Sequence, residues 1–218
     1  MKEHKAFISV LVVYLFLFLP FLGSAHLFDW DEINFAEAAR EMLVTGDWWN
    51  VKIGYEPFWE KPPFFIWMQA ISMQLFGINS FAARLPNVLV GFITLIVLYS
   101  AVYKRYSKRA ALYAVLLYLG SFTPHFYFKS GIIDPTFNLF IFLSVLQILA
   151  YIETKRSKHF FLTGLWLGAA IITKGPAALL IVGLVGLVYQ VYYRHNFYTI
   201  KSLLVLLLGL VVFPLIYF

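Results

Sequence analysis

Long apolar runs separated by short polar segments make up most of this 218-residue chain. The first run, residues 6–25, has about 20 mostly apolar residues, which is the length that a helix needs to cross the hydrocarbon core of a bilayer. We predict that it is the first membrane span. A cleaved signal peptide is the alternative, because the basic head before this run and the small residues Gly23, Ser24 and Ala25 at its end fit that pattern too.

A long polar interval, residues 26–63, follows this run. It contains eight of the eleven carboxylates of the chain: Asp29, Asp31, Glu32, Glu37, Glu41, Asp47, Glu56 and Glu60. It is also rich in aromatic residues that a solvated linker would expose at a cost: Trp30, Trp48, Trp49, Phe58 and Trp59. The pattern therefore predicts a folded, functional loop that lies on a membrane domain.

Within this loop, one segment has the periodicity of an amphipathic helix of about three turns. Its apolar positions recur at helical spacing, at Phe35, Ala38, Ala39, Met42 and Leu43, and Glu37, Arg40 and Glu41 fall on the other face. Asp29 or Asp31 can cap its start, and Gly46 can end it. We expect this helix to lie flat at the membrane interface.

The next apolar run, residues 64–78, has only 15 residues and contains two glutamines, so we predict a second interfacial or re-entrant helix rather than a span. With this choice, the basic cluster of residues 104–109 lies in the cytoplasm, as the positive-inside rule requires. The predicted fold is an all-α, polytopic transmembrane bundle of about seven spans with its amino terminus inside. The six later spans are residues 81–103, interrupted near Arg84 and Pro86, and residues 110–128, 137–152, 160–173, 177–193 and 202–218.

Composition supports an integral membrane protein. Hydrophobic residues make up 61% of the chain and charged residues 13%, whereas soluble domains carry roughly 25% charged residues. The net charge of +6 comes from short basic clusters between apolar runs, which mark the cytoplasmic side of a membrane protein and disfavour a nucleic-acid partner. Because the sequence has no cysteine, it has no disulfide, thiolate metal site or thiol nucleophile.

The predicted topology brings separate parts of the chain to the same face. The first loop, Lys129, Asp134 and Lys174 all lie on the outer side. We therefore predict a single membrane domain, residues 1–218, in which carboxylates and ammonium groups meet in one outer-face site.

Asp31 and Glu32 lie at the start of the amphipathic helix, close to the end of the first span. An acid in the first helical turn can simply stabilise the helix dipole. A carboxylate beside the bilayer is also partly desolvated, so that it accepts a hydroxyl proton more readily and can act as a general base. Both interpretations stay open.

The segment Glu60-Lys61-Pro62-Pro63 presents a lysine from stiff, extended backbone, because Pro62 keeps Lys61 out of the helical region. Its ammonium group suits a lipid phosphate, and a snorkelling lysine paired with Glu60 is the alternative. Asp134 and Lys174 occupy turns next to Pro135 and Gly175-Pro176. They fit either ordinary turn chemistry or a functional role, the lysine as a second phosphate contact.

Other classes of site are not indicated. The sequence contains no HExxH, Walker, GxGxxG or GxSxG pattern. No cofactor is required, although a divalent cation held by Asp31, Glu60 or Asp134 is a further prediction. A transporter is disfavoured, because the charged groups do not cluster in mid-span.

Taken in order, several motifs resemble the GT-C superfamily of membrane glycosyltransferases, in the group of protein O-mannosyltransferases and lipid A aminoarabinose transferases. They are DEINFAEAAREMLVTGDWW, EKPPFFIWMQAISMQLFG, FAARLPN, Asp134-Pro135 and Lys174-Gly175-Pro176. The resemblance implies an inverting transfer of a sugar from a polyprenyl-phosphate donor to an acceptor, whether lipid, glycan or protein. It also implies a bacterial inner membrane with the site on the periplasmic face.

The same resemblance implies residue roles. Asp31, with Glu32 beside it, is the catalytic base, and Lys61 faces the lipid phosphate. The predicted substrate-binding residues are Glu60, Lys61, Asp134, Lys174 and Arg40. Members of this superfamily have more spans, and this chain ends inside an apolar run at Phe218, so we expect an incomplete catalytic domain. A non-catalytic lipid-phosphate-binding or assembly subunit, or an inactive fragment, is the alternative.

Overall fold

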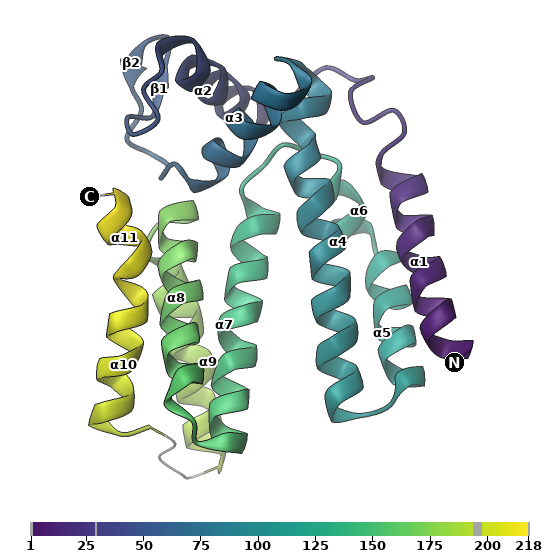
Figure 1. Ribbon diagram of the computed structural model, residues 1–218, viewed down its shortest axis with the longest axis vertical. Helices are drawn as coiled ribbons and strands as arrows, with labels where there is room; N and C mark the ends of the chain where they lie inside the picture. Colours follow the sequence, from purple (N-terminus) through teal and green to yellow (C-terminus); the bar gives the residue numbers. More distant parts are fainter. Residues whose placement is uncertain (1, 29, 194–197, 218) are drawn as a thin grey trace. The chain divides into compact units, whose positions relative to one another are not determined.

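The computed structural model describes residues 2–28, 30–193 and 198–217. The chain divides into two compact units, one of residues 1–58 and 66–135 and the other of residues 59–65 and 136–218. The described part is almost entirely helical (Figure 1), which confirms the predicted all-α class. Its elements are α1 (Lys2–Phe18), α2 (Asp31–Thr45), β1 (Lys52–Ile53), β2 (Glu56–Pro57), α3 (Phe64–Phe76), α4 (Ser80–Arg105), α5 (Lys108–Leu119), α6 (Phe122–Phe128), α7 (Asp134–Thr154), α8 (Ser157–Lys174), α9 (Ala177–Tyr193), α10 (Ile200–Leu210) and α11 (Val212–Tyr217).

Two of the described helices are long and apolar enough to cross a membrane, α4 with 26 residues and α7 with 21. The other apolar helices are shorter, and they are Lys5–Phe18, Phe64–Phe76, Ala177–Tyr193 and Ile200–Leu215. The predicted number of seven spans is therefore not confirmed.

Helix α1 ends at Phe18 and does not continue to residue 25 as predicted. Pro20 explains this end, because proline restricts the residue before it and lacks the backbone N–H that would extend a helix. The chain then forms turns in which the amide of Ser24 donates to the carbonyl of Phe21 at 3.1 Å. These turns leave several carbonyl groups without helical partners.

Helix α4 runs without a break, so the predicted interruption near Arg84 and Pro86 is wrong. Asn79 caps its start, since its side chain accepts a hydrogen bond from the amide of Ala82 at 2.9 Å. Pro86 lies in the second turn and costs one backbone hydrogen bond there. Its side chain is buried, and burial of apolar area offsets part of that cost.

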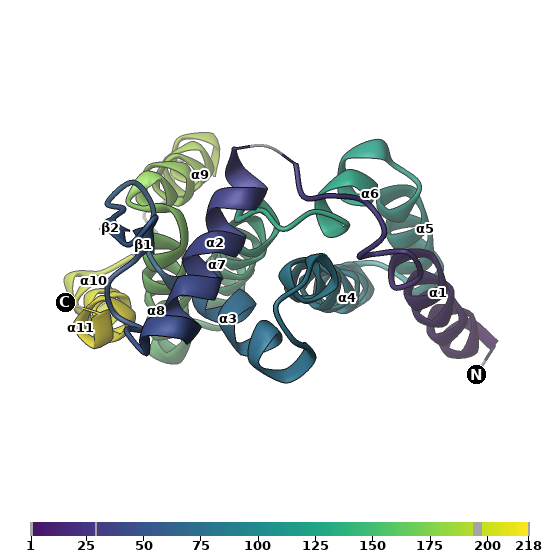
Figure 2. The ribbon, with the colours of Figure 1, turned by 90° about the horizontal axis from the view of Figure 1, so that it is seen from above.

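In the first unit, α1, α4 and α5 lie side by side, and α6 follows α5 (Figures 1 and 2). The ring of Tyr14 stacks on that of Phe18, with 4.3 Å between centroids, and its hydroxyl donates to the carbonyl of Val88 at 2.8 Å. The predicted span of residues 110–128 is broken into α5 and α6 at Gly120 and Ser121.

Helices α2 and α3 form a second core of the first unit. Both were predicted as short helices, α2 within the loop and α3 directly after it. The apolar face of α2, with Ala38, Ala39 and Met42, packs in one cluster with Ala70 of α3 and Ala83 of α4. Gly46 ends α2 at φ 72°, as predicted. A left-handed residue at this position suits glycine because it has no side chain to clash with the backbone.

Glu41 does not lie on an exposed polar face as predicted. Its side chain is buried, and its carboxylate accepts hydrogen bonds from the backbone amide of Tyr55 at 2.9 and 3.1 Å. Tyr55 lies in the tight turn between β1 and β2, so this acid fastens the hairpin to α2.

The second unit is built around α8, which contacts α9, α10 and α11. Tyr151 of α7 packs edge-on against Phe160 of α8, with 4.1 Å between ring centroids. Phe64, in the first turn of α3, packs edge-on against Phe140 at 5.2 Å. The predicted turn after Lys174 is present, with Gly175 at φ 87°.

Candidate active site

A buried ion pair holds the start of α2 in place. The carboxylate of Glu32 accepts two hydrogen bonds from the guanidinium of Arg84 on α4, at 2.8 and 2.9 Å. The same carboxylate accepts the backbone amides of Phe28 and Gly131. Both partners are nearly inaccessible to solvent, with 1% of Glu32 and 3% of Arg84 exposed. Four donors thus occupy the two oxygens of Glu32, which leaves it no room for a substrate proton.

Arg84 also binds the turns that follow α1. It donates to the backbone carbonyls of Leu22, Ala25 and His26 at 2.9 to 3.0 Å. With its two bonds to Glu32, all five N–H donors of the guanidinium are used. Arg84 therefore supplies hydrogen-bond donors to the backbone carbonyls of Leu22, Ala25 and His26, which lie after the end of α1.

Two buried amides fix the segment that follows α6. Asn87 donates to the carbonyls of Ser130 and Ile132 at 2.6 and 2.7 Å. Gln69 donates to the carbonyl of Gly131 at 3.4 Å and to that of Ala83 in α4 at 2.8 Å. A side chain at Gly131 would lie 3.0 Å from Gln69 and 3.2 Å from Glu32. Gly131 is therefore required for the close approach of this segment to the ion pair.

Asp31 differs from its neighbour because its side chain is exposed. It is the first residue of α2, and it follows Trp30, a non-glycine residue with φ 72°. Such a conformation is strained for tryptophan and persists only where surrounding contacts fix the backbone. Here the bonds of Glu32 and Arg84 supply those contacts. An exposed carboxylate thus projects from an immobilised first turn.

The capping prediction for α2 is wrong for Asp31, which lies inside the helix. The residue before the helix is Trp30, and no side chain caps this end among the described residues. Asp29, the other predicted cap, lies outside the described residues.

The predicted substrate-binding residue Arg40 is paired on the surface of α2. It donates to Glu37 at 2.6 and 2.8 Å, and this bond raises the pKa of Arg40. The hydrogen bond from Arg40 likewise holds the pKa of Glu37 below its usual value. With part of its side chain exposed and its charge already matched, Arg40 is a weaker candidate for binding an anionic substrate.

Glu60 and Lys61 belong to the second unit. Glu60 is exposed and Lys61 is half-buried, and both precede the buried Pro63 and the first turn of α3. Lys174 ends α8 in the same unit, and its ammonium group lies 5.8 Å from the ring centroid of Phe137. Asp134 begins α7 and belongs to the first unit, directly after the segment that Asn87 fixes.

The structure thus places the predicted residues in two sets. The first unit contains Asp31, Glu32, Arg40 and Asp134, and the second contains Glu60, Lys61 and Lys174. No group of three histidine, aspartate or glutamate side chains suited to a metal ion occurs in the described residues. A cation at Glu60 or Asp134 stays a prediction.

The sequence interpretation did not assign Arg84 a role, and it missed the two buried amides Gln69 and Asn87. A signal was available, because an arginine within an apolar helix is costly unless it is paired. The partner of Arg84 was not identifiable from the sequence, since the loop of residues 26–63 contains eight acids that could pair with it.

Comparison with known proteins identifies relatives for most of the chain. The model of the family described as dolichyl-phosphate-mannose-protein mannosyltransferase matches residues 60–218. Undecaprenyl phosphate-alpha-4-amino-4-deoxy-L-arabinose arabinosyl transferase from Photorhabdus laumondii is 30% identical over 195 residues, which are 87% of this chain and 35% of that protein. The protein of the same name from Aeromonas hydrophila is 31% identical over 84% of this chain and 34% of its own length.

Solved structures agree with these relatives. The crystal structure of ArnT from Cupriavidus metallidurans in the apo state superposes with a TM-score of 0.85 at 25% identity, over 98% of this chain and 42% of that protein. The same protein bound to undecaprenyl phosphate gives the same TM-score and identity over 98% and 41%. The chain thus spans about a third of the length of its curated relatives. The resemblance identified from the sequence motifs is confirmed at the level of the family.

Proposed function

Because this chain belongs to the dolichyl-phosphate-mannose-protein mannosyltransferase family, we propose that it takes part in the transfer of a sugar from a polyprenyl-phosphate carrier to an acceptor. The observation that carries this proposal is the exposed carboxylate of Asp31 on a first turn that Glu32 and Arg84 immobilise. The proposal places the site on the periplasmic face of a bacterial inner membrane, and the relatives named above come from bacteria.

In the proposed reaction, an oxygen of the acceptor attacks the anomeric carbon of the sugar while Asp31 accepts the hydroxyl proton. The bond between that carbon and the phosphate oxygen breaks, and its electron pair leaves with the lipid phosphate. Attack opposite the leaving group inverts the anomeric configuration. The departing phosphate is a stable anion, so the reaction needs a base but no general acid.

Lys61 is the proposed partner of the lipid phosphate, with Lys174 as a second cation. An ammonium group next to the phosphate stabilises the negative charge that grows as the bond breaks. Both lysines belong to the second unit, and Lys61 extends from backbone that two prolines stiffen. A divalent cation at Glu60 or Asp134 would serve the same purpose by neutralising the phosphate.

Glu32 is proposed to position Asp31 and not to react. Its two oxygens are bound by four N–H donors, and its burial isolates it from substrate. Geometric precision at a reacting group has a large effect on rate, since a misplacement of about 1 Å can cost on the order of 100-fold. The role of Glu32 is therefore distinct from that of its neighbour.

The test compares Asp31→Asn with Asp47→Asn, two substitutions of exposed or half-exposed acids in the same unit. The protein, expressed from its complete gene in bacterial membranes, is supplied with undecaprenyl-phosphate aminoarabinose or a polyprenyl-phosphate mannose. Release of the polyprenyl phosphate is measured. We expect Asp31→Asn to lower the rate by about 100-fold or more, because a general base typically contributes that much, and Asp47→Asn to leave it unchanged. Full activity of Asp31→Asn would refute the assignment.

A second candidate function is a subunit that binds a lipid phosphate without turning it over, because Lys61 extends a cation from backbone that prolines stiffen whether or not a reaction follows. Binding of undecaprenyl phosphate with no release of sugar, unaffected by Asp31→Asn and lost in Lys61→Gln, would favour this function over catalysis.

A further inference from the structure

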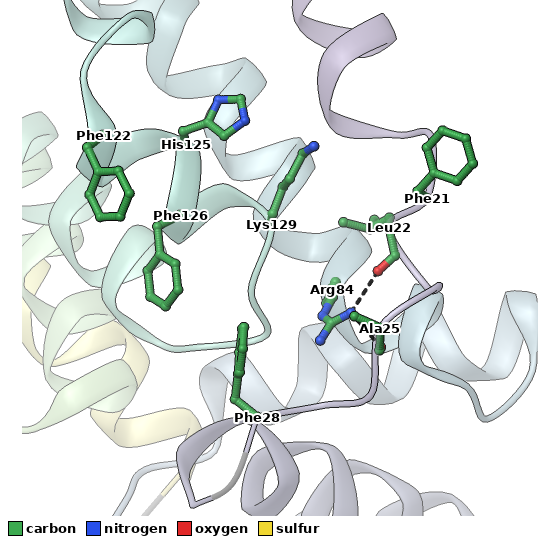
Figure 3. A pocket seen from close by; sticks show the side chains of 9 residues that line it. All are labelled: Phe21, Leu22, Ala25, Phe28, Arg84, Phe122, His125, Phe126 and Lys129. Atoms are coloured by element: carbon green, nitrogen blue, oxygen red, sulfur yellow. Dashed lines mark hydrogen bonds between the residues drawn. The ribbon is translucent and has the colours of Figure 1, made fainter.

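A pocket with a volume of about 290 Å³ lies in the first unit, and Arg84 is the only one of its described lining residues that the proposed function uses. The turns after α1, the segment before α2, Arg84 and helix α6 form its walls, with Lys129 at the end of α6 (Figure 3). Figure 3 shows phenylalanine side chains disposed around His125 and Lys129. The lining residues are Phe21, Leu22, Ala25, Phe28, Arg84, Phe122, His125, Phe126 and Lys129.

Among the described residues, the pocket has a positive charge without an acidic partner. Arg84 is neutralised by Glu32, and none of the described lining residues is acidic. Lys129 makes no ion pair with a described residue, and its ammonium group lies 5.6 Å from the ring centroid of Phe18. A cation–π contact stabilises the ammonium but leaves its charge in place. His125 packs on the same ring, with 4.8 Å between centroids. The complementary ligand group is therefore an anion.

The rim of the pocket is apolar and exposed. Phe21 and Phe122 are 87% and 83% exposed, and Phe28 and Phe126 are 52% and 45% exposed. Exposed apolar side chains that lie close together are typical of surfaces that contact a membrane. A free anion would bind the lysine but would leave the phenylalanines uncovered, whereas the glycerol and upper acyl chain of a lipid would cover them.

From this combination of charge and aromatic rim, we infer that the pocket binds the anionic phosphate head group of a bilayer phospholipid. The phosphate contacts Lys129, with His125 beside it, and the acyl chains extend past the phenylalanine rim into the membrane. A volume of about 290 Å³ is at the lower end of ligand pockets, so it holds a head group and not a whole lipid. Lys61 is not one of the lining residues, and no role in binding the sugar donor is proposed for this pocket.

Lys129→Gln and Lys108→Gln form a matched pair for the test. Each substitution removes one positive charge from a lysine that lies 5.6 Å from an aromatic ring, but Lys108 lies over Tyr103 at the start of α5 and does not line the pocket. The protein is purified in a neutral detergent and titrated with phosphatidylglycerol or with phosphatidylcholine, and bound lipid is counted by native mass spectrometry. A parallel titration uses inorganic phosphate as competitor.

We expect phosphatidylglycerol to bind more tightly than phosphatidylcholine, and Lys129→Gln to weaken this binding by about tenfold, as loss of one charge-assisted hydrogen bond implies. Lys108→Gln and Lys129→Arg should bind as the unaltered protein does. Phe126→Ala should weaken binding of the lipid. It should not change how much lipid inorganic phosphate displaces. The thermal midpoint of each variant verifies that it is folded.

Three outcomes would overturn the inference. Equal losses in Lys129→Gln and Lys108→Gln would mean that the lipid responds to overall charge alone. Displacement of the lipid by millimolar inorganic phosphate would indicate a site for a free anion. Equally tight binding of phosphatidylcholine and phosphatidylglycerol would show that the charge of Lys129 does not select the lipid. If Lys129→Gln does not fold, then loss of binding in folded Phe126→Ala decides in favour of the inference, and retention decides against it.

Discussion

Arg84 is the side chain on which the arrangement of the first unit depends most, because it binds Glu32 and three backbone carbonyls in a buried site. We expect Arg84→Lys to destabilise the protein, because each buried acceptor that is left without a donor costs about 1 to 3 kcal/mol. Lysine keeps the charge but lacks the planar fork, so that it cannot reach all of these acceptors at once. The measurement is the midpoint of thermal unfolding in detergent.

Arg40→Lys is the matched control for this prediction. Arg40 also pairs with a glutamate, but the pair lies on the surface of α2 with 29% of its arginine side chain exposed. Surface pairs contribute about 0 to 1 kcal/mol, so this substitution should change the midpoint little. Similar shifts in both variants would contradict the special role of Arg84.

Asp47 gives a prediction for the dependence of stability on pH. The hydrogen bond from Lys52, at 2.7 Å, and the amide of Asn50 lower the pKa of Asp47 in the folded protein. A carboxyl group with a lowered pKa stabilises the fold above its unfolded pKa, near 3.9, and loses that contribution as the pH falls through its folded pKa. The gap in thermal midpoint between the unaltered protein and Asp47→Asn should therefore be small but present at pH 7, and it should narrow below about pH 4. A gap that does not change with pH would contradict this role.

Residue patterns predicted some of these environments and not others. The face of α2 with Phe35, Ala38 and Met42 was predictable, because apolar residues at helical spacing must be buried together. The burial of Glu41 was not, because its partner is a backbone amide 14 residues later in a hairpin that the sequence interpretation missed. The same applies to Glu32, whose partner Arg84 lies 52 residues away. A sequence pattern places an acid on a solvent-exposed face, and its burial becomes evident only when its hydrogen-bond donors are known.

At the scale of elements, α8 and α10 pack through glycines. A Cβ atom at Gly164 would overlap the backbone carbonyl of Leu206, and one at Gly209 would overlap that of Phe161. Small residues that let two helix backbones approach are typical of helix pairs in membranes. Gly164→Ala should therefore separate the two helices and destabilise the second unit by about 1 to 3 kcal/mol, the usual cost of overpacking.

Gly183→Ala in α9 is the matched control, because a Cβ atom there meets no atom within 4 Å. Alanine is the better helix former by about 1 kcal/mol, so Gly183→Ala should leave the thermal midpoint unchanged or raise it. Opposite shifts for the two variants, measured in the same detergent, would support close packing of the glycines. A rise in the thermal midpoint of both variants would mean that the backbones of α8 and α10 are far enough apart to accommodate a methyl group at Gly164.

The helices themselves were largely predictable, and their breaks were not. Apolar runs indicated α3, α4 and α7, since only a helix satisfies its own backbone in a bilayer. The run after residue 199 is divided into α10 and α11, and that of residues 110–128 into α5 and α6. Such breaks depend on which backbone groups find tertiary partners, as the carbonyls near Leu22 do at Arg84. Hydropathy alone carries no information about those partners.

At the scale of the whole molecule, the proposed function requires that the start of α2 faces the outside. Within the first unit, α2 packs against Ala82 and Ala83 near the start of α4, whereas Tyr106 lies directly after the end of α4. The 26 residues of α4 give a length of about 39 Å, enough to cross a hydrocarbon core of about 30 Å. Tyr55, in the hairpin that contacts α2, and Tyr106 should therefore lie on opposite sides of the membrane.

Cysteine labelling tests this sidedness without background, because the chain has no cysteine. Tyr55 and Tyr106 are 57% and 77% exposed. In spheroplasts, a membrane-impermeant maleimide should react with Tyr55→Cys directly and with Tyr106→Cys only after permeabilisation. Tyr113→Cys, on an exposed face in the middle of α5, should react in neither condition if lipid covers that face. Labelling of Tyr55→Cys and Tyr106→Cys from the same side would mean that α4 does not cross the membrane, and Asp31 would then have no defined outer face on which to meet a lipid-linked sugar.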